Sequence, residues 1–113
     1  MQVLRNEPWS VTEPGIMKLS GRIDSMSSPR IEEDVLLCIQ SGTRDMILDC
    51  NEVTYITGAG VQSLLRLARE MQAARGRLVV CNLRQRETFD FCGLDSVIPA
   101  YDTLTEARTA LAD

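Results

Sequence analysis

The sequence has 113 residues, of which 44% are hydrophobic and 25% are charged. This composition predicts one globular domain over residues 1–113 with a hydrophobic core, and it argues against a disordered chain. The 12 basic and 16 acidic residues give a net charge of −4 with no basic run, which argues against nucleic-acid binding because phosphate contacts require a clustered positive surface.

The sequence also argues against membrane and metal-dependent classes. No apolar stretch approaches the roughly 20 residues that a membrane helix requires, and the N-terminus lacks a signal-peptide pattern. We therefore expect a cytoplasmic protein without a membrane partner. The absence of histidine excludes Ser-His and Cys-His catalytic arrangements and the usual catalytic zinc sites. We expect no cofactor and no metal ion.

Four cysteines are widely spaced and form no Cys-x-x-Cys pair; they are Cys38, Cys50, Cys81 and Cys92. Each lies in an apolar context on an expected strand or helix face, which favours buried free thiols. A zinc site or a disulfide framework is the less favoured alternative.

The N-terminal part of the chain predicts a β-hairpin. An apolar pair at residues 3–4 begins the first strand, and residues 9–11 continue it with the two-residue alternation of a strand. The Pro14-Gly15 pair is a strong turn signal. The return strand is expected from residue 16 to residue 20.

A first helix is expected near Ser28, which can cap it, with Pro29 at the first helical position. Apolar residues then recur at helical spacing and form one buried stripe of Ile31, Val35, Cys38 and Ile39. The helix should end at Gly42. We expect an apolar strand after it, from about residue 45 to about residue 50.

The most informative segment comes next, where an extended run ends in the small-residue turn Thr57-Gly58-Ala59-Gly60 and opens directly into a second helix. The first turn of a helix has unpaired backbone N–H groups and a partial positive charge. Because this turn has almost no side-chain bulk, another backbone or an anion can approach it closely. We therefore expect the functional site here.

The second helix is the best-defined element and is expected from residue 58 to residue 75. Its apolar stripe keeps helical spacing over several turns and consists of Val61, Leu64, Leu65, Ala68 and Met71. Ser63 is expected on the opposite, solvated face. Gly76 ends the helix.

The remaining chain continues the alternation of strands and helices. Residues 77–81 form an apolar run typical of a strand covered on both faces. We expect a short helix next, at 84–91, closed by Gly93, and then a brief strand at 97–99. A final helix starts with the capping box Thr103 to Glu106. The order predicts an α/β fold with a mixed sheet of about four or five strands, an N-terminal hairpin and about four helices. Aromatic side chains are expected to pack in or beside the core; they are Trp9, Tyr55, Phe89, Phe91 and Tyr101.

Five segments in order resemble a known family. They are residues 19–24 (Leu-Ser-Gly-Arg-Ile-Asp), 47–49 leading to 53–56, the helix start with Gly60 and Leu64-Leu65, residues 76–81, and residues 91–99. Together they resemble a STAS domain of the anti-sigma factor antagonist type over essentially the whole chain.

The resemblance implies a regulator of transcription that works by partner switching. Such antagonists bind an anti-sigma factor with a kinase-like, ATP-binding fold, so that it releases its sigma factor. The partner can phosphorylate a serine at the helix start, and the added charge of about −1.5 to −2 then ends the binding. The partner-binding and switch residues that the resemblance implies are Asp24, Asp49, Thr57, Gly58, Ala59 and Gly60. A homodimer is left open.

One position departs from the family pattern. Gly58 occupies the phosphoserine position, so the usual phosphorylation cannot occur there. Thr57 is the nearest hydroxyl; we favour a helix N-cap role for it over that of a substitute phosphoacceptor.

Asp24 and Asp49 are expected at the ends of strands, where loop capping and partner contact are both open. Paired carboxylates can serve acid–base catalysis. Without a histidine, a nucleophile or a metal-ligand cluster, however, we expect no enzyme.

An alternative function is a nucleotide- or small-ligand-binding STAS module, such as an accessory subunit of a transporter ATPase. Its motivation is the same glycine-rich helix start, which can receive a phosphate group. The signal is weak because Thr-Gly-Ala-Gly lacks the lysine and the length of a P-loop.

Overall fold

The computed structural model describes residues 9–13, 15–84 and 86–112. The apolar pair at residues 3–4, expected in the first strand, lies outside these ranges. The elements in order are β1 (Trp9–Glu13), β2 (Ile16–Ile23), α1 (Ser28–Gln40), β3 (Asp45–Ile56), α2 (Gly58–Ala73), β4 (Arg77–Cys81), α3 (Arg86–Phe91), the 3-10 turn η1 (Leu94–Ser96), β5 (Ala100–Tyr101) and α4 (Leu104–Leu111).

These elements form the predicted α/β domain. The five-stranded sheet has the order β1-β2-β3-β4-β5. The hairpin strands β1 and β2 are antiparallel, and the pairs β2–β3, β3–β4 and β4–β5 are parallel. The sheet is therefore mixed, as the order of the predicted elements indicated.

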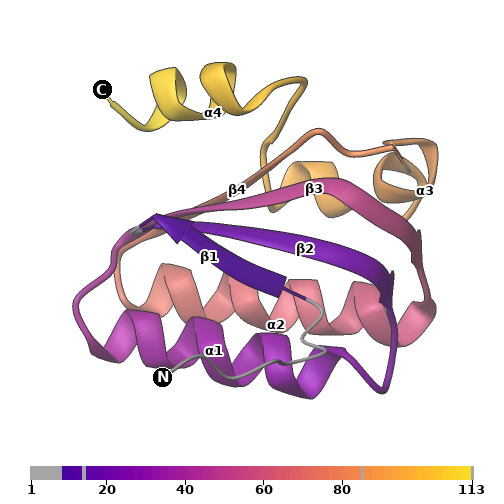
Figure 1. Ribbon diagram of the computed structural model, residues 1–113, viewed down its shortest axis with the longest axis horizontal. Coiled ribbons are helices and arrows are strands. Elements are labelled where there is room, and N and C mark those ends of the chain that lie inside the picture. Colours follow the sequence, from indigo (N-terminus) through magenta and orange to yellow (C-terminus); the bar gives the residue numbers. More distant parts are fainter. Residues whose placement is uncertain (1–8, 14, 85, 113) are drawn as a thin grey trace.

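Helices cover both faces of the sheet. Figure 1 shows α1 and α2 side by side beneath one face and α4 over the other. The larger core lies between the sheet and the α1–α2 pair, and the fully buried Met17, Leu48 and Leu67 belong to it. A smaller core beneath α4 contains Ile47, Val79 and Ala107. The β2–α1 and β3–α2 connections lie at the same end of the molecule, on the right in Figure 1.

Register shifts in β3 carry the strand to the start of α2. Lys18 pairs with Asp49, but Ser20 pairs with Glu52, and a second shift occurs beside Gly21. The β3 side chains in the larger core are Met46, Leu48, Cys50, Val53 and Ile56, so their spacing changes from two residues to three at the shifts. Such bulges let one strand keep its apolar side toward the core over its whole length.

The first helix begins differently from the prediction that Ser28 caps it. Ser28 is the first helical residue and is buried, and its Oγ has no hydrogen-bond partner. The N-cap position belongs to Ser27, whose side chain makes no cap hydrogen bond. The Ser27 hydroxyl instead donates to the Arg22 carbonyl at 2.8 Å and accepts the Asp24 N–H at 3.1 Å. The Ser27 hydroxyl therefore closes the turn between β2 and α1 and does not cap the helix.

Two further predictions were wrong, on the brief strand and on Cys92. The brief strand lies at Ala100–Tyr101 and not at 97–99. Pro99 has no N–H to donate, and its carbonyl accepts the Val80 N–H of β4 just before the strand begins. Cys92 is exposed, whereas Cys50 and Cys81 are buried as expected. Of the aromatic side chains expected in or beside the core, Phe89 is buried and Tyr55 is half exposed.

Candidate functional site

The start of α2 is attached to the end of β2 through one carbonyl group. The Thr57 N–H donates to the Ile23 carbonyl oxygen at 3.0 Å, and the Thr57 hydroxyl donates to the same oxygen at 3.3 Å. The Thr57 Oγ1 also accepts the Gly60 N–H at 3.2 Å, which is an N-cap hydrogen bond. The predicted N-cap role of Thr57 is therefore what the structure shows.

The two glycines of this turn have different environments. A Cβ at Gly60 would lie 2.2 Å from the Ile23 carbonyl oxygen, so only glycine lets α2 approach β2 this closely. A Cβ at Gly58 would meet nothing within 4 Å. Gly58 and Ala59 are exposed, and Gly60 is buried. We call residues 57–60 the ledge, a stretch of helix start with little side-chain bulk.

The β2–α1 turn lies against the ledge because Asp24 directly follows Ile23. The Asp24 Oδ1 accepts the N–H groups of Met26 and Ser27, each at 3.0 Å. The Ser27 N–H is the main reason that the pKa of this carboxyl lies below its ordinary value. Asp24 is therefore an ionised turn cap beside the ledge.

Asp49 lies elsewhere. It is in the interior of β3 and not at a strand end as predicted, because β3 continues to Ile56. Its Oδ1 accepts the Asn51 N–H and the Asn82 Nδ2–H, both at 3.1 Å. At about 3.3 Å per residue, the remaining strand separates Asp49 from the ledge by roughly 25 Å. The structure thus brings Asp24 to residues 57–60 and leaves Asp49 apart, and the two carboxylates form no pair.

A polar cluster missed by the sequence analysis fixes α2 against α1. Ser63, expected to be solvated, is 1% exposed and its hydroxyl donates to Glu32 Oε2 at 2.7 Å. Arg66 donates to both oxygens of Glu32, at 2.9 and 3.2 Å. The Arg66 hydrogen bond chiefly lowers the pKa of Glu32, the Ser63 hydroxyl lowers it further, and partial burial opposes both. Ser63 and Arg66 lie three residues apart on one face of α2, but the sequence of this helix does not indicate the carboxylate that they share, because it comes from α1.

We expect Ser63→Ala to lower the free energy of unfolding by about 1 kcal/mol at neutral pH, because a hydrogen bond to a charged group is lost. The pKa of Glu32 is lower in the folded state than its ordinary value of 4.5, so its stabilisation is present above that value and is lost as the pH falls through the lowered pKa. Urea unfolding at pH about 7 and about 3.5 should therefore show a smaller Ser63→Ala effect in acid. The exposed neighbour Gln62, changed to Ala, serves as the control; an equal loss at both pH values would contradict the assignment.

The buried thiols are not reactive groups. Burial raises the pKa of Cys81 to about 12 and that of Cys50 further, and the Asp49 carboxylate adds to both shifts. The four cysteines are free thiols. Among the described residues there is no group of three acidic, cysteine or histidine side chains that could hold a metal ion.

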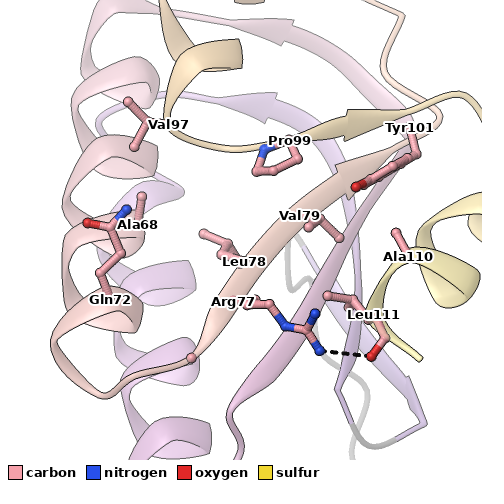
Figure 2. Close-up of a pocket in the computed structure, with 11 residues that line it drawn as sticks. Ala68, Gln72, Arg77, Leu78, Val79, Val97, Pro99, Tyr101, Ala110 and Leu111 are labelled. Atoms are coloured by element: carbon pink, nitrogen blue, oxygen red, sulfur yellow. Dashed lines mark hydrogen bonds between the residues drawn. The ribbon is translucent and has the colours of Figure 1, made fainter. Parts of the chain in front are cut away.

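Surface hollows lie away from the ledge. Figure 2 shows a hollow of about 210 Å³ beside β4 and α4, lined in part by Leu78, Tyr101 and Leu111. The Arg77 guanidinium in it donates to the Leu111 carbonyl at 2.8 Å (Figure 2) and pairs with Asp45. A second hollow, of about 410 Å³, is formed by residues 51–54 and Arg84. Neither includes residues 57–60.

Within the ranges that the structure covers, no helix has both the length and the apolar character to cross a lipid bilayer.

Comparison with known proteins identifies the family of this chain. The model of the STAS domain matches residues 9–107. The chain belongs to the STAS domain family. This match includes the ledge and the β2–α1 turn.

The relatives of this STAS domain carry a common description. BtrV of Bordetella bronchiseptica, named as a candidate anti-sigma factor antagonist, is 29% identical over 94 residues, which are 81% of each chain. A candidate anti-sigma factor antagonist from Thermotoga maritima has a TM-score of 0.81 at 13% identity and covers 95% of both chains. The Bacillus cell fate determinant SpoIIAA, solved in its phosphorylated form, has a TM-score of 0.68 at 22% identity and covers 91% of this chain and 96% of its own. The two structural likenesses show the fold.

Proposed function

We propose that this STAS domain is an anti-sigma factor antagonist that acts in the cytoplasm and has no enzymatic activity. It docks the ledge onto an anti-sigma factor with a kinase-like, ATP-binding fold, which then releases its sigma factor. The family match and the described role of BtrV support the class of function. The exposed Gly58 and Ala59 support the place of contact, because another backbone can approach them without steric hindrance.

One observation supports the regulatory part of the proposal: Gly58, which the resemblance places at the phosphoserine position, is exposed and has open space around it. Gly58 has no hydroxyl to accept a phosphate. The adjacent Thr57 hydroxyl donates to the Ile23 carbonyl and accepts the Gly60 N–H, so its phosphorylation would remove the proton that joins it to Ile23. The antagonist therefore binds its partner without being switched off at the helix start.

The other implied residue roles follow from their geometry. Asp24 supports the site by fixing the turn beside the ledge, and Asp49 contributes little because it is roughly 25 Å away. A nucleotide-binding function is less well supported, because the Gly60 N–H, one of the helix-start groups that would cradle a phosphate, already donates to the Thr57 hydroxyl oxygen.

The test is a titration of the chain with the purified product of a kinase-like reading frame adjacent to its gene, before and after incubation with ATP. We expect binding in both cases, with affinities that agree within about twofold, and no mass increase on the chain. The matched control is Gly58→Ser, which fits the open space and restores the acceptor. It should gain a phosphate and lose binding after ATP. A phosphate mapped to Thr57 of the unmodified chain would contradict the proposal.

A further inference from the structure

We propose that Met26 is the apolar anchor of this interface and inserts into an apolar hollow on the anti-sigma factor next to the point where the ledge docks. This inference rests on the proposed function and adds to it a specific residue and the chemistry of its receptor. Met26 lies outside the five segments that carry the family resemblance. The inference comes from the exposure of the side chain, the hydrogen-bonded backbone of its turn and its position beside the ledge.

Exposure singles out this residue. The large hydrophobic side chains that are exposed in the described parts of the chain are Met26 at 82%, Leu37 at 54% and Tyr55 at 52%. Leu37 lies in the last turns of α1. Met26 and Tyr55 lie at the end of the molecule that carries the ledge, because Tyr55 precedes Thr57 by two residues and Met26 lies in the β2–α1 turn (Figure 1). Exposed apolar side chains that gather at one place mark interaction sites.

The turn holds Met26 in a fixed position. Its own N–H donates to the Asp24 carboxylate, which also accepts the Ser27 N–H. The Ser27 hydroxyl closes the turn through the Arg22 carbonyl and the Asp24 N–H, and the Ser28 N–H donates to the Asp24 carbonyl at 2.9 Å. An exposed methionine on an ordered backbone loses little backbone entropy when it binds, so its apolar area is available for affinity.

Contacts through Arg22 and Asp24 join the turn that carries Met26 to Tyr55, and we call residues 22, 24, 26 and 55 the strip. The Arg22 guanidinium lies 5.1 Å from the centre of the Tyr55 ring, and its Nε lies 3.5 Å from Asp24 Oδ2. Asp24 in turn binds the Met26 N–H. The only ionic groups in the strip, Arg22 and Asp24, neutralise each other.

The charge balance of this strip decides the kind of surface that receives it. A strip without net charge fits an uncharged, apolar receptor better than an acidic or basic one, since an unpaired charge in an interface is costly. Methionine is flexible and polarisable, which suits insertion into an irregular apolar hollow. The strip is continuous with the ledge through Ile23, so the occupant is the same partner that docks there.

The test compares two exposed apolar side chains by titration with the same purified anti-sigma factor. Met26→Ala should weaken binding by at least about tenfold, as at other interface hot spots, and should leave the thermal unfolding midpoint unchanged. Met26→Leu, which keeps an apolar side chain, should bind within about threefold of the unmodified chain. Leu37→Ala, the matched control on α1, should change the affinity by less than about twofold.

The outcomes separate this inference from the proposed function. If Gly58→Asp abolishes binding but Met26→Ala does not change it, the ledge docks and the anchor is wrong. If Leu37→Ala weakens binding more than Met26→Ala, the interface uses the α1 surface and the inference is overturned. If the unmodified chain does not bind the anti-sigma factor, both the function and the anchor are wrong.

Discussion

Replacing Gly60 by alanine should destabilise the fold by about 3–5 kcal/mol, or prevent soluble expression. The new Cβ would lie 2.2 Å from the Ile23 carbonyl oxygen and 3.0 Å from both the Ile23 carbonyl carbon and Ile56 Cγ2. The first two of these are backbone atoms and cannot turn aside as a flexible side chain would. To relieve the overlap, α2 must move away from β2, which breaks the hydrogen bonds from Thr57 to Ile23.

Gly58→Ala is the matched control for this prediction, because it adds the same methyl group two residues earlier. Its Cβ would meet nothing within 4 Å, and Gly58 does not have a positive φ angle. We expect the free energy of unfolding to rise or fall by no more than about 1 kcal/mol. Urea unfolding of both variants checks the pair. Equal stabilities of the two variants would contradict the close contact between α2 and β2.

Gly58→Asp should weaken binding to the anti-sigma factor by about a hundredfold or more, because a carboxylate would be buried without a partner in the interface. The same carboxylate lies in the first turn of α2, where the positive end of the helix favours an anion. The stability of the isolated chain should therefore stay equal or increase by about 0.3–1 kcal/mol. Loss of binding together with unchanged or improved stability is a combination that misfolding cannot produce.

Gly58→Asn separates charge from bulk in this experiment. Asparagine has nearly the shape of aspartate and fits the same open space, but it carries no charge. We expect it to weaken binding by about tenfold less than Gly58→Asp does. Titration calorimetry with the purified anti-sigma factor measures both affinities. Equal losses in the two variants would mean that steric bulk, and not charge, controls this position.

The sequence predicted the fold because local and long-range signals agreed. The Pro14-Gly15 turn, the continuous apolar run of β4 and the glycine-rich start of α2 each specify one element, and the alternation of elements leaves few sheet orders. Ser63 was placed wrongly because a helix has more than one buried side. The apolar stripe of α2 packs on the sheet, while α1 covers the adjacent face of α2, where Ser63 lies. The sequence of α2 alone does not indicate that second neighbour.

The site was predicted in part. The ledge is a local feature, so the residues that form it and the N-cap role of Thr57 are visible in the sequence. The exposure of Met26 is not visible in the sequence, because it depends on a turn that is closed by hydrogen bonds of Asp24 and Ser27. The distance of Asp49 from the ledge was also missed. The register shifts let β3 run on to Ile56, and those shifts depend on its pairing with β2.

The location of the contact is the central claim, and amide hydrogen exchange of the chain, free and in complex with the anti-sigma factor, measures it most directly. We predict that binding slows exchange at residues 24–27 and 58–62 and leaves α4 and the hollow in Figure 2 unchanged. Slower exchange confined to α4 and β4, with residues 24–27 and 58–62 unaffected, would place the partner on the opposite face of the sheet and contradict the account.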